Sequence, residues 1–203
     1  MIHINQDMSD SALLLKALEF AAERHRKQFR KGLDKTPFIN HPIQVASLLA
    51  NEANETDPVL LAAAVLHDVI EDTVESVSER DDLSCLIAGM FGEEVLLLTM
   101  EVTDDKTLDK KERKRLQVEN ASHKSVNARK LKIADKIMNL RDITDNPPAD
   151  WPLERIFAYL DWAENVVAGL RGVNKILEDM FDESLSRSRS KYGSGLVQDV
   201  RFY

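Results

Sequence analysis

Hydrophobic residues recur at helical spacing along most of the chain. In residues 11–25, for example, Leu14, Leu18 and His25 fall on one helix face, where we interpret His25 as a packing residue. The unbroken apolar run from Leu60 to Leu66 predicts a helix that is buried on all sides. No alternation with the two-residue period of a β-strand survives a helical interpretation. The pattern therefore predicts an all-α fold, built as a helical bundle.

Caps and breakers along the chain indicate where these helices begin and end. Asp57-Pro58 combines an N-cap residue with a first-turn proline. Gly92 is suited to end one helix, and Pro147-Pro148 to stop another. The last helix can be interrupted near Gly169 and Gly172. The expected helices begin near Ser11, Pro42, Pro58, Ser84, Glu93, Thr107, Asn127 and Asp150.

The bulk composition fits one compact domain in a reducing compartment. The chain has 203 residues, of which 43% are hydrophobic, and a single cysteine, which excludes an internal disulfide and a cysteine metal cluster. The polar N-terminus shows no secretory signal and no apolar stretch is long enough to span a bilayer, so we expect a cytoplasmic protein. We expect residues 1–183 to form the domain and residues 184–203, rich in serine and arginine, to form a flexible tail.

The net charge of −8 argues against general binding of nucleic acid, which needs a basic surface. It leaves room for a small anionic substrate that binds a local basic patch. Arg30 and Lys31 are the best candidates for this patch, because they lie in the loop after the first helix. Lys106 is a further candidate for a phosphate contact. Arg24 and Lys27, in contrast, are interpreted as solvated residues of a helix face.

Chemically active side chains concentrate between His67 and Thr73, directly after the buried apolar run. One imidazole and three carboxylates, those of Asp68, Glu71 and Asp72, follow one another closely. If the helix continues through them, His67 lies over Glu71 and Asp68 over Asp72. A solvated helix end is the alternative, but the cost of desolvating four such groups favours a functional cavity.

Two distant segments supply groups that complement this cluster. His41 ends an extended stretch, and Asp135 lies on the polar stripe of a later helix. With His67 and Asp68 they make a set of two imidazoles and two carboxylates. Such a set, without thiolate, favours a divalent ion such as manganese or iron over a structural zinc.

The order His…His-Asp…Asp resembles that of the HD phosphohydrolases. Longer strings are similar to the hydrolase domain of RelA/SpoT proteins, above all to the stand-alone small alarmone hydrolases of the metazoan SpoT-homologue type. The resemblance covers roughly residues 11–179, and one departure is Phe38, where the family commonly has tyrosine. The strings that carry it are Arg30-Lys31, Thr36–Pro42, Leu66–Thr73, Val102–Leu108, Glu112–Val118 and Ala134–Asp142.

The resemblance implies an HD-domain bundle and a manganese-dependent hydrolase. The implied reaction removes the 3′-pyrophosphate from the alarmone guanosine 3′,5′-bis(diphosphate), ppGpp, or from its pentaphosphate form, pppGpp, to give GDP or GTP. There is no room for a complete synthetase domain beside this core. The implied metal ligands are His41, His67, Asp68 and Asp135.

The remaining site residues receive expected roles from their positions and from the resemblance. Glu71 is the leading candidate for the general base and Asp72 supports it, since both lie one helical turn beyond proposed ligands. By resemblance, Arg30 would lie against the guanine ring and Lys31 beside a phosphate. Asn139 can offer both a donor and an acceptor to ribose or phosphate. Tyr159 and Trp151 are candidates for the outer wall, and Trp162 for the core.

Two other functions stay open from the sequence alone. The same metal site could serve an NADPH 2′-phosphatase or another nucleotide phosphohydrolase, because similar basic and aromatic groups bind all these ligands. A non-catalytic nucleotide-sensing domain could retain the fold. The presence of every metal ligand and of the Glu71-Asp72 pair disfavours the non-catalytic interpretation.

Overall fold

The computed structural model describes residues 8–199, and their side chains up to residue 193. Within this part of the chain every regular element is a helix, accompanied by two isolated β-bridges, so the all-α prediction is confirmed. The chain divides into two compact units. Unit 1 comprises Met1–Phe29 and Pro37–Arg113, and unit 2 comprises Arg30–Thr36 and Lys114–Tyr203.

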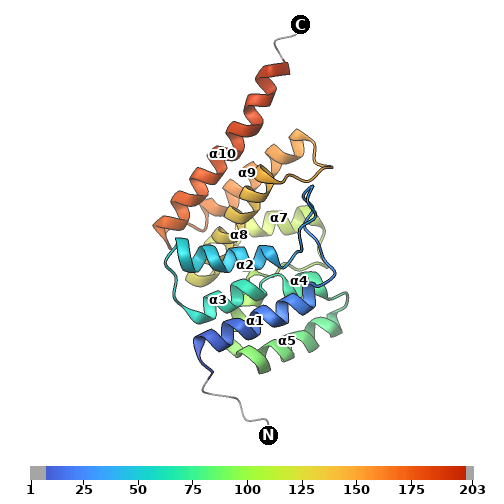
Figure 1. Ribbon diagram of the computed structural model, residues 1–203, viewed down its shortest axis with the longest axis vertical. Helices are drawn as coiled ribbons and strands as arrows, with labels where there is room; N and C mark the ends of the chain where they lie inside the picture. Colours follow the sequence, from blue (N-terminus) through green and yellow to red (C-terminus); the bar gives the residue numbers. More distant parts are fainter. Residues whose placement is uncertain (1–7, 200–203) are drawn as a thin grey trace. The chain divides into compact units, whose positions relative to one another are not determined.

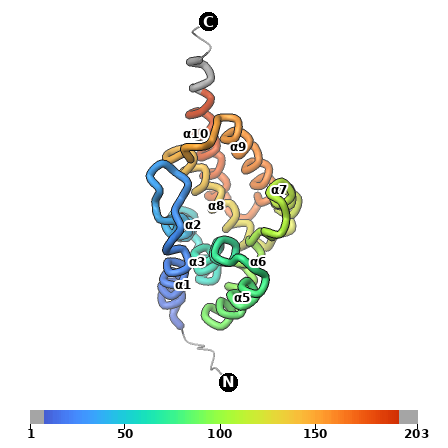
Figure 2. Tube along the Cα trace, turned by 90° about the vertical axis from the view of Figure 1, so that its right-hand side faces the viewer, coloured from blue at the N-terminus to red at the C-terminus, as the bar shows by residue number. Residues whose placement is uncertain are grey.

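Unit 1 is built around the apolar helix α3. The side chains from Ala62 to Leu66 are fully buried, and α3 packs against α1 and α2 (Figure 1) and against α6. Helix α5 lies beside α6 (Figure 2). The elements are α1 (Asp10–His25), α2 (Asn40–Ser47), the π-helical turn η1 (Leu48–Glu52), α3 (Pro58–Leu66), α4 (Val69–Thr73), α5 (Val77–Phe91), α6 (Glu93–Val102) and the start of α7 (Lys110–Glu119).

The predicted start of α3 is confirmed, but its predicted continuation is not. Pro58 occupies the first turn, and the Asp57 carboxylate accepts a hydrogen bond from the Val59 amide at 2.9 Å. The helix ends at Leu66, and α4 begins only at Val69. The His67 ring bonds the carbonyl oxygen of Ala64, the group that the amide of residue 68 would use in a continuous helix. The side chain therefore competes with the backbone at the point where the helix ends.

Unit 2 is centred on the long helix α8, which packs against both α9 and α10 (Figures 1 and 2). The predicted interruption near Gly169 and Gly172 is present, because α9 ends at Ala168 and Gly172 has a φ of +88°. The elements are the rest of α7, the 3₁₀ turn η2 (Ala121–His123), α8 (Val126–Asp145), α9 (Leu153–Ala168) and α10 (Lys175–Asp199).

The segment from residue 184 to Asp199, expected from the sequence as a flexible tail, belongs to helix α10 in the structure. Leu185 is 5% exposed, and the buried Ser188 hydroxyl bonds that of Thr144 on α8 at 2.6 Å. The Tyr192 hydroxyl donates to a carbonyl oxygen of α8 at 2.5 Å. The sequence of this segment shows no clear hydrophobic periodicity, because some of its buried positions are serines that pack by hydrogen bonding. Residues 200–203 of the expected tail lie outside the described residues.

Three predicted helix starts are displaced along the chain. Helix α5 begins at Val77, with Ser76 as its cap, seven residues before the expected start at Ser84. The carboxylate of Asp109, and not Thr107, bonds the first amides of α7. Ser125 caps α8 in place of Asn127. In all three cases a nearby residue with equal capping ability takes the position. No helix in the described part has the length and hydropathy to cross a membrane.

We expect Leu185→Ala to destabilise the protein by about 2–5 kcal/mol, because it leaves a cavity under the ordered part of α10. Urea unfolding measures the free-energy difference. Ser186→Ala, at the exposed neighbouring position, is the control and should change the free energy of unfolding by less than about 0.5 kcal/mol. Equal stability of the two variants would show that this segment does not pack against α8.

Candidate active site

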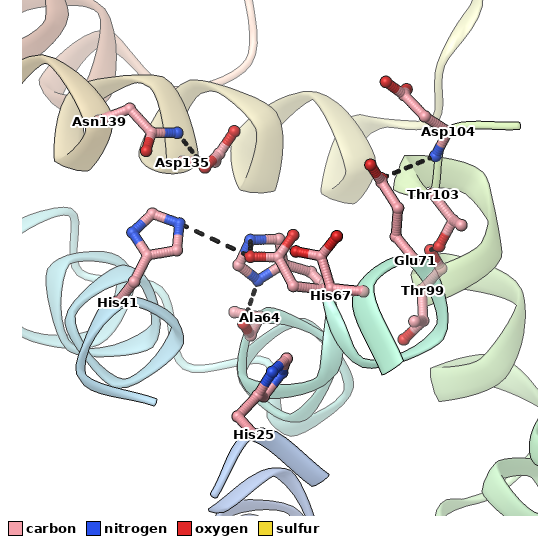
Figure 3. A network of polar contacts seen from close by, with 12 residues as sticks. His25, His41, Ala64, His67, Glu71, Thr99, Thr103, Asp104, Asp135 and Asn139 are labelled. Carbon is pink, nitrogen blue, oxygen red and sulfur yellow. Dashed lines mark hydrogen bonds and ion pairs between the residues drawn. The ribbon is translucent and has the colours of Figure 1, made fainter. Parts of the chain in front are cut away.

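Unit 1 brings two buried histidines together. His41 lies in the first turn of α2 and His67 directly after α3, and their ring centroids are 5.4 Å apart (Figure 3). The Nδ1 atom of His67 lies 2.8 Å from the carbonyl oxygen of Ala64. A carbonyl only accepts hydrogen bonds, so Nδ1 carries the hydrogen. The lone pair of the neutral ring is therefore on Nε2, as a metal ligand requires.

The carboxylate of Asp68 approaches both rings. Its Oδ2 atom lies 3.1 Å from His67 Nε2 and 3.9 Å from His41 Nε2, and the side chain is 20% exposed. Two imidazole nitrogens and one carboxylate oxygen thus converge within unit 1. This donor set fits a divalent cation that accepts nitrogen and oxygen ligands.

Asp135, the remaining predicted ligand, lies on α8 in unit 2. Its Oδ1 atom accepts a hydrogen bond from the Asn139 amide at 2.6 Å (Figure 3), and its Oδ2 atom lies 2.8 Å from Lys136 Nζ. Both carboxylate oxygens therefore have partners within one turn of the helix. The candidate metal ligands are divided between His41 and His67 in unit 1 and Asp135 in unit 2.

Glu71 lies on α4 in an environment that disfavours its charged form. Burial raises the pKa of its carboxyl to about 7, and the charges of Asp104, Asp68 and Asp72 act in the same direction. The Asp104 amide, which donates to Glu71 Oε2 at 3.0 Å, opposes this shift. Arg113 lies 3.8 Å from Oε1. A carboxyl that titrates near neutral pH is suited to exchange protons with water.

Asp72, the neighbour of Glu71, makes an ion pair with Lys106. The distance from Asp72 Oδ1 to Lys106 Nζ is 2.5 Å, and both side chains are partly exposed. Glu71 and Lys106 also line a pocket of unit 1, with Ile70 and Val74 on its apolar side. The structure thus brings three of the predicted residues to one region, and pairs Lys106 with a carboxylate.

The predicted substrate residues Arg30 and Asn139 contact each other in unit 2, where Asn139 lies on α8 and Arg30 in a loop. The guanidinium of Arg30 donates to Asp142 at 2.9 and 2.5 Å and to Asn139 Oδ1 at 2.8 Å. Asn139 therefore accepts from Arg30 and donates to Asp135. The oxygen and the nitrogen of its single side-chain amide connect the arginine to the candidate metal ligand. Lys31, the next residue along the loop, is exposed.

Tyr159 on α9 belongs to an aromatic cluster of unit 2. Its ring centroid lies 5.8 Å from that of Trp151 and 5.4 Å from that of Trp162. Burial raises the pKa of the Tyr159 hydroxyl to about 12, so this group stays protonated at neutral pH. Lys136 lies over the Trp162 ring, with its ammonium 4.8 Å from the centroid.

The sequence interpretation missed several residues that surround these groups. Asp142 pairs with Arg30, Lys136 with Asp135, and Arg113 lies near Glu71. Lys136 is only 4% exposed, and a lysine next to a ligand candidate within an apolar stripe could have indicated a buried ion pair. The other contacts join residues far apart in the chain and leave no local pattern.

Comparisons with known proteins converge on one family. The HD-domain profile matches residues 17–160. The guanosine-3′,5′-bis(diphosphate) 3′-pyrophosphohydrolase MESH1 of Xenopus tropicalis is 49% identical, over 86% of this chain and 93% of that protein. The protein of the same name from Homo sapiens is 50% identical, over 84% and 92%. A solved structure, described as a metazoan ortholog of SpoT that hydrolyses ppGpp, superposes with a TM-score of 0.81 at 45% identity, over 89% of this chain and 98% of that one.

We expect Glu71→Gln to stabilise the metal-free protein increasingly as the pH rises. The folded-state pKa of about 7 exceeds the ordinary value of 4.5, so the unfolded chain ionises first and folding weakens between these values. Glutamine removes this penalty and can still accept the Asp104 amide bond. One pKa unit corresponds to about 1.36 kcal/mol. Between pH 5 and pH 8, the free energy of unfolding of Glu71→Gln relative to the wild type should therefore rise by about 1–3 kcal/mol.

Urea unfolding of chelator-treated protein at the two pH values measures this gain. The control is Glu19→Gln, at an exposed position of α1, which should show no comparable pH-dependent gain. A Glu71→Gln stability difference that is the same at pH 5 and pH 8 would contradict the prediction.

Proposed function

Because this chain belongs to the HD-domain family, in the group of the MESH1 pyrophosphohydrolases, we propose that it hydrolyses guanosine 3′,5′-bis(diphosphate). The products are GDP, or GTP from the pentaphosphate form, and pyrophosphate. The observation that carries this proposal is the identity of 49% over 93% of the Xenopus protein, whose name states the same reaction.

We propose that His41, His67, Asp68 and Asp135 hold one divalent ion, and that this ion is manganese. The convergence of Asp68 on the two imidazoles, together with the lone pair of His67 on Nε2, supports this set. Asp135 is the candidate from unit 2. When bound, such an ion supplies a Lewis acid and lowers the pKa of coordinated water.

Glu71 is the general base of the proposed reaction. Its carboxylate accepts the proton of the attacking water while the bond between phosphorus and the ribose 3′ oxygen breaks. A pKa of about 7 lets the group accept this proton and release it again near neutral pH. The Asp104 amide bonds one of its oxygens, and Arg113 lies 3.8 Å from the other. Asp72, paired with Lys106, supports the site from the next position.

The nucleotide contacts come from Arg30, Lys31, Lys106, Asn139 and Tyr159. Asp142 and Asn139 fix the plane of the Arg30 guanidinium. A guanine ring can stack against this plane. The exposed ammonium of Lys31 is available to a phosphate. All residues with a proposed role lie within residues 1–183, which we propose as the hydrolase domain.

The decisive test is pyrophosphate release from guanosine 3′,5′-bis(diphosphate) by chelator-treated protein, with and without added manganese. We expect turnover only with the metal, because the proposed ligand set requires it. Phosphate release from NADPH is measured on the same preparation. A specificity constant for NADPH above that for the guanosine nucleotide would replace the proposed substrate, and no hydrolysis of either would reject both.

We expect Glu71→Gln to lower turnover by about 100- to 10,000-fold, the usual contribution of a general base. The variant should keep one equivalent of manganese, since Glu71 is not among the proposed ligands. Glu19→Gln should leave turnover unchanged. Near-normal turnover of Glu71→Gln with a full complement of metal would show that another group accepts the proton.

A further inference from the structure

The short helix α4, which carries Glu71 and Asp72, is held at its C-terminal end by one side chain from the last turn of α1 and one from the segment after it. The last carbonyl groups of a helix have no partner within it. In α4 the Asp72 carbonyl accepts from Gln28 Nε2 at 2.7 Å, and the Thr73 carbonyl accepts from Arg24 Nη2 at 2.9 Å. Two residues on one side of unit 1 thus supply the donors that α4 lacks.

Thr73 extends this connection through its side chain. Its hydroxyl donates to the Val69 carbonyl at 2.7 Å and accepts from Arg24 Nε at 2.9 Å and Nη2 at 2.7 Å. The first and last residues of α4 are therefore linked to each other and to the guanidinium. The positive charge of Arg24 also lies at the helix end that favours cations.

The orientation of the Gln28 amide is fixed by His25. Because Gln28 Nε2 donates to Asp72, its Oε1 atom is the acceptor that lies 2.6 Å from His25 Nδ1. His25 is 1% exposed, and burial lowers its pKa. A protonated ring would carry a second N–H at Nε2, which has no hydrogen-bond partner among the described residues. The neutral ring, with its hydrogen on Nδ1, thus orients Gln28 towards α4.

We propose that Arg24 and Gln28 are positioning residues for the hydrolytic pair Glu71 and Asp72. Gln28 bonds the carbonyl of Asp72 itself, one peptide beyond Glu71, while the Asp104 amide bonds the Glu71 carboxylate. The pair is therefore fixed through both its backbone and a side chain. Small displacements of a catalytic group are costly in rate. This inference rests on the proposed function for the roles of Glu71 and Asp72.

The first experiment compares Gln28→Met with Lys27→Met, a control at the neighbouring exposed position. Methionine keeps the length of Gln28 and removes its donor. We expect kcat per bound manganese to fall about 10- to 100-fold in Gln28→Met, the range for a displaced catalytic group, with KM and metal stoichiometry unchanged. Lys27→Met should match the wild type. A proportional loss of bound metal, with normal kcat per metal, would overturn the proposal.

A double-mutant cycle separates positioning from a general structural effect. If Gln28 acts through Glu71, then adding Gln28→Met to Glu71→Gln should cause little further loss of turnover. If Gln28→Met lowered turnover by the same factor in the wild type and in Glu71→Gln, the inference would be contradicted. In the same assay Arg24→Lys should retain more activity than Arg24→Met, because lysine can still donate to the Thr73 carbonyl.

Hydrogen exchange of the metal-free protein tests the contact without any substrate. Removal of the Gln28 donor should speed amide exchange in residues 69–74, whereas Lys27→Met should not. Unchanged exchange in this segment would overturn the inference whatever the enzyme hydrolyses. Wild-type protein that releases no pyrophosphate would instead reject the proposed function, so the two failures are distinguishable.

Discussion

A helix as apolar as α3 cannot end inside the protein without leaving polar groups that need partners. His67 supplies a partner for one of these groups, because its ring donates to the carbonyl of Ala64 at 2.8 Å. The same bond fixes the tautomer and directs Nε2 towards Asp68. One hydrogen bond thus serves both the end of the core helix and the orientation of the His67 ring.

The break after α3 also determines where the carboxylates lie. Since α4 starts as a new short helix, Glu71 and Asp72 are placed by contacts from outside it. The Asp104 amide bonds the Glu71 side chain, and Gln28 and Arg24 bond the end of the helix. These contacts hold Glu71 in a buried position, where desolvation raises its pKa to about 7. Partners that hold this carboxylate in the interior thus also set its acidity.

The parts of the fold that the sequence predicts are those with a local physical cause. The run from Leu60 to Leu66 and the Asp57-Pro58 cap identify α3, because burial and capping act within a few residues. The order of histidines and aspartates indicates the family by resemblance, although these residues lie far apart in the chain. Helix α10 beyond residue 184 was missed, since hydroxyl groups such as that of Ser188 pack by hydrogen bonding and look solvated in a sequence.

Contacts between distant residues are the features that the sequence pattern could not predict. Arg24 follows the pattern of a solvated helix face, but its guanidinium bonds Thr73, 49 positions away. Arg30, which the resemblance places against the guanine ring, also pairs with Asp142, 112 positions away. Such partners depend on how helices pack, and helical periodicity carries no information about them.

The pairing of Arg30 changes how a nucleotide would be recognised. Asp142 and Asn139 bond the guanidinium at its edge, so a bound base would meet the flat face of a group that is already oriented. Asn139 at the same time donates to Asp135. Within unit 2, the residue proposed to stack on guanine and the residue proposed to bind metal thus share one amide. A displacement of Asn139 would disturb its contacts with both Arg30 and Asp135. The proposed substrate residue and the proposed metal ligand would therefore be coupled through α8.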